Sequence, residues 1–149
     1  MSARHLGPLF AVVVAGCSQE RPSFPAVEYL PMQANRPLPF SAAVRVGPTL
    51  YLSGQLGTDS AARLVPGGIV PETRQALNNV RAILGRAGGT MDDVVKCTAM
   101  LADMSEWAAM NQEYVTHFRK DRLPARSALG TSGLAMDARV EIECIAVLQ

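Results

Sequence analysis

The spacing of the apolar residues switches along this chain between the period of a helix and that of a strand. From Ala76 to Ala87 the apolar residues follow the three-four spacing of one buried helical face, and Gly88 with Gly89 forms a stop signal. Residues 139–148 (RVEIECIAVL) instead alternate, as a half-buried strand does. At 149 residues, the chain is long enough for one domain that combines both element types.

Further runs of the same two kinds complete the expected order of elements. Gly47-Pro48 is a turn between two strand-like runs, which predicts an antiparallel hairpin. The following stretch, 55–68, is rich in turn residues and reads as a loop. The predicted strands are 40–46, 49–54, 92–101, 125–130 and 139–148, and the predicted helices begin near Pro71 and at Asp103.

The second helix carries less regular signals than the first. Asp103 and Glu106 have capping-box spacing. His117 lies near the expected C-terminal end, where a cation suits the helix dipole, so we interpret it as structural. The predicted buried stripe consists of Trp107, Met110, Tyr114 and Phe118.

The order ββαβαββ predicts an α+β fold with an open sheet and two amphipathic helices. Such helices cover one face of the sheet and leave the other face in need of cover. Oligomerisation is the simplest way for a chain of this size to bury that second face.

The N-terminus has the pattern of a secretory signal. Residues 1–17 combine a basic start, a short apolar centre and small residues before Cys17, and VAGC at 14–17 resembles the bacterial lipobox. The alternative is a buried helix with an incidental cysteine. We expect a lipidated Cys17, a tether at 18–35 and a domain at 36–149, exported to the periplasm. By analogy, the serine after the cysteine favours the outer membrane as the site of anchoring.

Two cysteines, Cys97 and Cys144, remain in strand-like runs. They could pair in an oxidising compartment if their strands are neighbours. Because cross-strand disulfide geometry is demanding, we favour packed, unpaired thiols.

Composition excludes several function classes. A net charge of +1 and an aromatic content of 5% argue against nucleic acid as a partner. One histidine outside the signal, with no CxxC and no carboxylate cluster, argues against a metal site. The sequence also lacks GxSxG, Walker and GxGxxG motifs.

The polar candidates that remain are Arg126 and a pair of glutamates. Arg126, in LPARSALG, presents a planar fork that matches a carboxylate. Glu141 and Glu143 share one face of the last strand. Taken alone, each of these side chains is also compatible with a solvated surface charge.

A set of motifs narrows this choice. YLSGQLGTD, TRQALNNVRAIL, MDDVVKCTAMLADM, MNQEYVTHF, PARSAL and VEIECIAV occur in order between Pro39 and Val147. Together they resemble the RidA family of reactive enamine/imine deaminases. This resemblance implies a chorismate-mutase-like homotrimer with sites in the clefts between subunits. It also implies cofactor-free hydrolysis of 2-imino acids to 2-keto acids and ammonia.

The resemblance also assigns roles to individual residues. Arg126 matches the arginine that binds the substrate carboxylate, and Glu141 matches the glutamate that helps place the hydrolytic water. Ser53, Gly54 and Asn111 match residues that line the pocket.

Two positions depart from the family pattern. Phe40 stands where a tyrosine is frequent and so lacks its hydroxyl. Ala128 replaces a frequent cysteine that contributes largely through its backbone, so the contact should survive.

Two other functions stay open beside deamination, the first of them because export conflicts with the mostly cytoplasmic origin of such imines. The first is a non-catalytic, trimeric binding protein for small carboxylates. The second is an endoribonuclease, an activity of some relatives, against which both the charge and the expected location argue.

Overall fold

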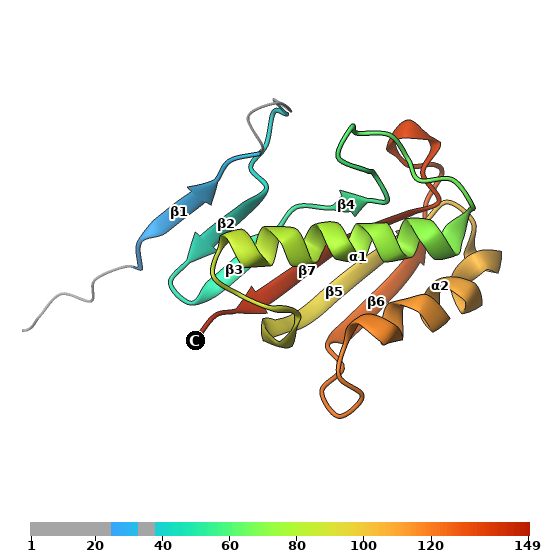
Figure 1. The fold of residues 1–149 in the computed structure, drawn as a ribbon. Coiled ribbons are helices and arrows are strands. Elements are labelled where there is room, and N and C mark those ends of the chain that lie inside the picture. Colours follow the sequence, from blue (N-terminus) through green and yellow to red (C-terminus); the bar gives the residue numbers. More distant parts are fainter. Residues whose placement is uncertain (1–24, 33–37) are drawn as a thin grey trace, which may run out of the picture.

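A computed structural model describes residues 25–32 and 38–149 of this chain. The expected signal, the lipidation site Cys17 and most of the expected tether lie outside these residues. The described residues form seven strands and two α-helices, which are labelled in Figure 1. Their bounds are β1 Val27–Leu30, β2 Ala43–Val46, β3 Thr49–Leu52, β4 Gln55–Leu56, α1 Ile69–Arg86, β5 Val94–Leu101, α2 Trp107–Tyr114, β6 Ala125–Gly130 and β7 Val140–Val147.

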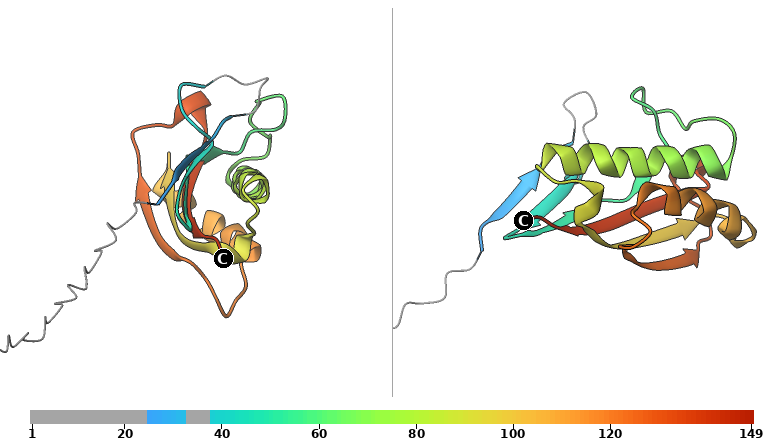
Figure 2. Two further views of the ribbon diagram at one scale, coloured as in Figure 1. Left: turned by 90° about the vertical axis from the view of Figure 1, so that its left-hand side faces the viewer. Right: turned by 60° about the horizontal axis from the view of Figure 1, so that its bottom comes forward.

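The strands form one mixed sheet in the order β1-β2-β3-β7-β5-β6, and β4 pairs with β7. Strands β5 and β6 run parallel and the other pairs are antiparallel. Both helices lie against the same face of the sheet (Figure 2). The predicted α+β class, mixed sheet and one-sided helix layer are therefore confirmed.

The core lies between this sheet face and the helices. Helix α1 presents its predicted stripe, of which Ala76, Leu77, Val80 and Leu84 are fully buried. Leu50 of β3 and Ile142 of β7 meet the helices from the sheet side and are equally buried. The alternation of buried and exposed residues in both strands follows the predicted pattern.

The helix-free face of the sheet carries large apolar side chains that a single protomer leaves exposed. Tyr29 of β1 and Tyr51 of β3 lie in the same row across the sheet, through their shared partner Val44. Tyr29 is 69% exposed and Tyr51 49%. Leu129 of β6 and Val147 of β7 add to this surface. We call Tyr29, Tyr51, Leu129 and Val147 the open-face patch.

Two short strands were not predicted. Residues 27–30, which we placed in the tether, form β1 and pair with β2. The side chains of β1 are mostly exposed, so backbone hydrogen bonds to β2 rather than apolar burial stabilise this strand. Its sequence therefore has no alternation of apolar and polar residues that would predict a strand. Strand β4 lies within the expected loop 55–68. The strand predicted at 40–46 is shorter in the structure, because β2 starts at Ala43 and Phe40 lies outside it.

The helix boundaries also differ from the prediction. Helix α1 begins at Ile69, so Pro71 is its third residue, still within the first turn, where no intrahelical acceptor is needed. Before α2, Asp103 caps a 3-10 turn by accepting from Ser105 N at 2.8 Å. Glu106 pairs with Arg139 instead of completing the predicted capping box.

The predicted stripe of the second helix is only partly buried. Met110 and Tyr114 are buried, whereas Trp107 is 40% exposed. Phe118 is buried but lies beyond the helix, after a 3-10 turn at Val115–His117. Apolar spacing shows that residues share a helical face but not how fully each is covered, and Trp107 is the first residue of α2.

Cys97 of β5 and Cys144 of β7 form a disulfide, so the expectation of unpaired thiols was wrong. The register of the antiparallel pair places the two residues directly opposite one another, with their Cα atoms 4.1 Å apart. Each is 1% exposed. The two strands are adjacent only because of the folded topology, which the spacing of the cysteines in the sequence does not reveal.

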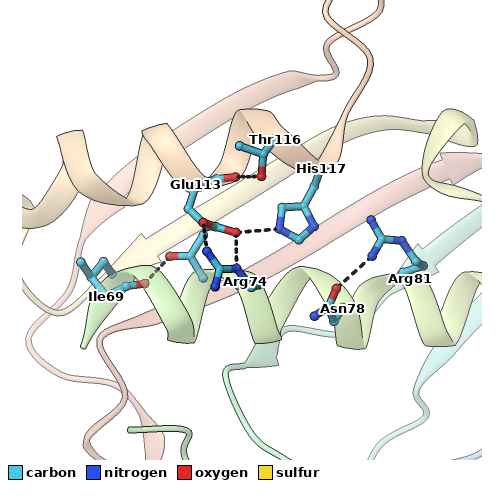
Figure 3. A network of polar contacts seen from close by, with 8 residues as sticks. Ile69, Arg74, Asn78, Arg81, Glu113, Thr116 and His117 are labelled. Atoms are coloured by element: carbon cyan, nitrogen blue, oxygen red, sulfur yellow. Dashed lines mark hydrogen bonds and ion pairs between the residues drawn. The ribbon is translucent and has the colours of Figure 1, made fainter. Parts of the chain in front are cut away.

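A polar network joins the two helices (Figure 3). Arg74 of α1 donates to both carboxylate oxygens of Glu113, at 2.9 and 2.7 Å. His117 Nε2 lies 3.2 Å from Oε1 of Glu113, and its side chain is 7% exposed. His117 therefore has a specific structural partner, the carboxylate of Glu113. The Arg74 bond lowers the pKa of Glu113, and burial lowers the pKa of His117.

We expect the protein to lose stability in acid in part through His117. Because its pKa is lower in the folded than in the unfolded chain, its contribution is complete above the ordinary histidine pKa and declines as the pH falls below it. Thermal melts between about pH 8 and pH 5 should show a smaller decrease in Tm for His117→Gln than for wild type. Equal decreases would contradict this prediction.

Candidate functional site

The guanidinium of Arg126 is held against one face of helix α2. Its Nη2 donates to Asn111 Oδ1 at 2.7 Å. The guanidinium carbon lies 4.5 Å from the ring centroid of Tyr114 and 5.8 Å from that of Trp107. We call Trp107, Asn111 and Tyr114 the arginine cradle. Two of the predicted site residues, Arg126 and Asn111, are thus brought together on the helix-covered side of the sheet.

Burial in the cradle leaves two polar atoms unpaired within the described part of the chain. These are Arg126 Nη1 and the Tyr114 hydroxyl. Burial raises the pKa of Tyr114 to about 12, and the nearby Arg126 charge opposes that rise. The tyrosine is therefore neutral at physiological pH, so the only charge in the cradle is that of the guanidinium.

Glu141 of β7 lies next to Gly54, the residue before β4. A Cβ built on Gly54 would come within 2.8 Å of the Glu141 carboxyl carbon, so only glycine leaves room for this carboxylate. Burial, with a further contribution from the charge of Glu143, raises the pKa of Glu141. A raised pKa makes the carboxylate a better proton acceptor, which suits a residue that polarises water.

Of the remaining predicted residues, Ser53 and Ala128 lie within two residues of Gly54 and Arg126, respectively, in the chain. Ser53 precedes Gly54, and its hydroxyl donates to the Ser41 carbonyl at 2.7 Å, which fixes it in place. Ala128 lies on β6, two residues from Arg126, and packs against the core. The Phe40 ring is 49% exposed.

Arg126 and Glu141 do not meet within one protomer. Arg126 is in register with Cys97 and Cys144, whose side chains point toward the helices. Glu141 is three residues from Cys144, an odd number, so it points to the opposite face. The structure thus divides the predicted site into an arginine half on the helix side and a glutamate half on the open face.

The aromatic part of the cradle was missed in the sequence. Trp107 and Tyr114 were assigned to the buried stripe, with no link to Arg126. Their positions relative to Asn111, at i, i+4 and i+7 along one helical face, were a usable signal. What the sequence did not show is that β6 lies beneath this face.

We predict that Gly54→Ala impairs turnover far more than stability. The added methyl collides with the end of a flexible side chain, which can move away, but the carboxylate then leaves its position. We expect kcat to fall about tenfold to a hundredfold. Gly85→Ala is a matched control, because nothing lies within 4 Å of its Cβ. Full activity of Gly54→Ala would show that the position of Glu141 is unimportant.

Other features of the described residues lie away from these two halves. A cavity of about 370 Å³ lies between α1 and the loop that follows β4, and none of the predicted site residues lines it. Within residues 25–32 and 38–149, no cluster of three or more potential metal-ligating side chains occurs. None of the helices described is long and apolar enough to cross a bilayer.

Known proteins are similar to this chain over most of its described residues. The profile of a family described as endoribonuclease L-PSP matches residues 33–148. A 2-iminobutanoate/2-iminopropanoate deaminase from Mus musculus is 49% identical over 110 residues, which are 73% of this chain and 81% of the mouse protein.

Solved structures agree with this match. RidA from an Antarctic Psychrobacter species superposes with a TM-score of 0.72 at 34% identity, covering 85% of this chain and all of that protein. A Rid-family protein of unknown function from Yersinia pestis gives a TM-score of 0.77 at 34% identity, covering 83% of this chain and all of that protein.

Proposed function

The chain belongs to the endoribonuclease L-PSP family, which includes RidA, and on this premise we propose that it hydrolyses 2-imino and enamine acids. It is an imine/enamine deaminase that converts these compounds to 2-keto acids and ammonia. The observation that carries this conclusion is the similarity, over nearly the whole domain, to proteins named 2-iminobutanoate/2-iminopropanoate deaminase.

We assign substrate binding to Arg126. A guanidinium can pair with the carboxylate of an imino acid through two parallel hydrogen bonds, which fixes both position and orientation. Its attachment to α2 through Asn111 supports this role, because the side chain is already ordered before substrate arrives. Asn111 then acts through the arginine rather than on the substrate.

We assign water activation to Glu141. Water adds to the imine carbon while the carboxylate accepts a proton from it, and the nitrogen gains protons and leaves as ammonia. The carbon–nitrogen double bond is thereby replaced by a carbon–oxygen double bond, with no change in oxidation state. The raised pKa of Glu141 supports this role.

We propose that the two halves of the site meet between protomers of a homotrimer. The open-face patch supports assembly, since large apolar side chains exposed on one sheet face favour a protein partner. The position of β6 at the end of the strand order supports it as well, because Arg126 lies at an edge that a neighbour can approach.

Mixed trimers test this arrangement. Arg126→Ala and Glu141→Gln should each be inactive alone. If a site takes its arginine from one protomer and its glutamate from the next, co-refolding equal amounts should restore about one quarter of the sites. No recovery in verified mixed trimers would show that each protomer supplies both groups to its own site.

The activity itself is tested with a freshly generated 2-imino acid and detection of the 2-keto acid. Turnover by the unmutated protein above the spontaneous rate supports the deaminase. Binding of 2-keto acids without turnover would favour the alternative, a trimeric binding protein for small carboxylates.

We also propose that the protein is exported and anchored by lipid on Cys17, as the pattern of its first seventeen residues indicates. The Cys97–Cys144 disulfide supports export, because such bonds form and persist in oxidising compartments. Mass spectrometry of the mature protein should find lipidated Cys17 at the N-terminus. An intact Met1 would contradict the proposal.

A further inference from the structure

We propose that Trp107 and Tyr114 are positioning residues for Arg126, with their rings setting the orientation in which the guanidinium meets a carboxylate. This inference rests on the proposed function, and it assigns a role to two residues that the sequence placed simply in the core. It makes α2 part of the substrate-binding apparatus.

The geometry supports three restraints on one side chain. Both ring centroids lie within the distance at which a cation is attracted to an aromatic face, at 4.5 Å for Tyr114 and 5.8 Å for Trp107. Asn111 adds a hydrogen bond to Nη2. All three restraints come from one face of one helix, so they hold Arg126 relative to a single rigid element. Ordering a flexible side chain before binding raises affinity, because less freedom is lost on binding.

The ring of Tyr114 is the part that acts on Arg126. Tyr114 is 3% exposed, and its ring packs against Phe118 with centroids 4.8 Å apart, so its position is fixed. Its hydroxyl has no hydrogen-bond partner among the described residues. Removing the Tyr114 hydroxyl should therefore preserve the orientation of the Arg126 guanidinium, whereas removing the ring should not.

Binding of 2-oxobutanoate to the full-length protein provides the test. Trp107 is the only tryptophan of the chain, so its fluorescence reports events beside Arg126 without any need for turnover. We expect Tyr114→Leu to raise the dissociation constant about threefold to thirtyfold, and Tyr114→Phe to change it less than about twofold. The matched control is Leu84→Ala, which removes a fully buried side chain of α1 that is not part of the arginine cradle, and its affinity should be unchanged.

Kinetics separate positioning from a general loss of structure. Tyr114→Leu should raise KM and leave kcat nearly unchanged, since the substrate carboxylate is held equally in the ground and transition states. Wild-type affinity in Tyr114→Leu, or an equal loss in Leu84→Ala, would overturn the proposal. So would a loss in Tyr114→Phe as large as that in Tyr114→Leu.

A second variant covers the case in which Tyr114→Leu does not fold. Trp107 is 40% exposed, so Trp107→Leu should fold, and calorimetry can replace fluorescence. Its affinity should fall about twofold to fivefold, and no change would overturn the role of the rings. Failure of the proposed function would look different: the unmutated protein would then bind 2-oxobutanoate but would not turn over a 2-imino acid.

Discussion

Arg126→Ala is expected to abolish measurable binding of 2-keto acids and to lower kcat/KM for an imino acid by about a hundredfold or more. The substrate carboxylate loses its charged partner, and truncating one member of such a pair costs about 2–5 kcal/mol. Each 1.4 kcal/mol corresponds to a factor of ten. Arg126→Lys should recover little, because an ammonium keeps the charge but not the planar fork.

The matched control for this prediction is Arg119→Ala. Arg119 pairs with Asp121 at the surface, and its side chain is 54% exposed. Its replacement removes the same charge from the chain but touches neither half of the site, so activity should stay at the wild-type level. Melting curves of both variants exclude a folding defect. Wild-type turnover in Arg126→Ala would refute the assigned role of the arginine.

Removing the disulfide is expected to have the largest effect on stability. A bond between residues 47 positions apart restricts the unfolded chain, which by chain entropy contributes about 4 kcal/mol. Measured effects are commonly smaller, so we expect Cys97→Ala with Cys144→Ala to lower the free energy of unfolding by roughly 2–4 kcal/mol. Urea denaturation at equilibrium measures this loss directly.

The same experiment with reductant provides the control. Unfolding the wild type in dithiothreitol should lower its stability to near that of the double variant, whereas the double variant should not respond. Thiol titration of the unreduced, denatured protein should find neither Cys97 nor Cys144 free. Two free thiols at these positions in protein recovered from the periplasm would contradict the structure and remove one support for export.

Local patterns were sufficient for most of the fold. The three-four spacing of α1 and the alternation of β3 and β7 identified which side chains face the core, and the structure buries those residues as expected. Strand β1 was not predicted, because backbone hydrogen bonds to β2 hold it in the sheet. Such bonds at an edge strand require no particular pattern of side chains.

The candidate site was predictable only in part. The candidate residues, among them Arg126 and Glu141, came from motifs that resemble those of the RidA family, and their roles stay predictions. The spatial relation of these residues did not follow from the motifs, since it depends on β5 lying between β6 and β7. A change of one residue in the register of either pair would move an entire row of side chains to the other face.

The sequence alone established an α+β fold with two amphipathic helices, and its motifs marked Arg126 and Glu141 as candidate site residues, because periodicity and motif are properties of neighbouring positions. Folding decided that Cys97 meets Cys144, that Trp107 and Tyr114 enclose Arg126, and that the arginine and glutamate point to opposite faces of one sheet. Those outcomes depend on which distant strands pair and in which register, and such contacts are set by the packing of the whole chain.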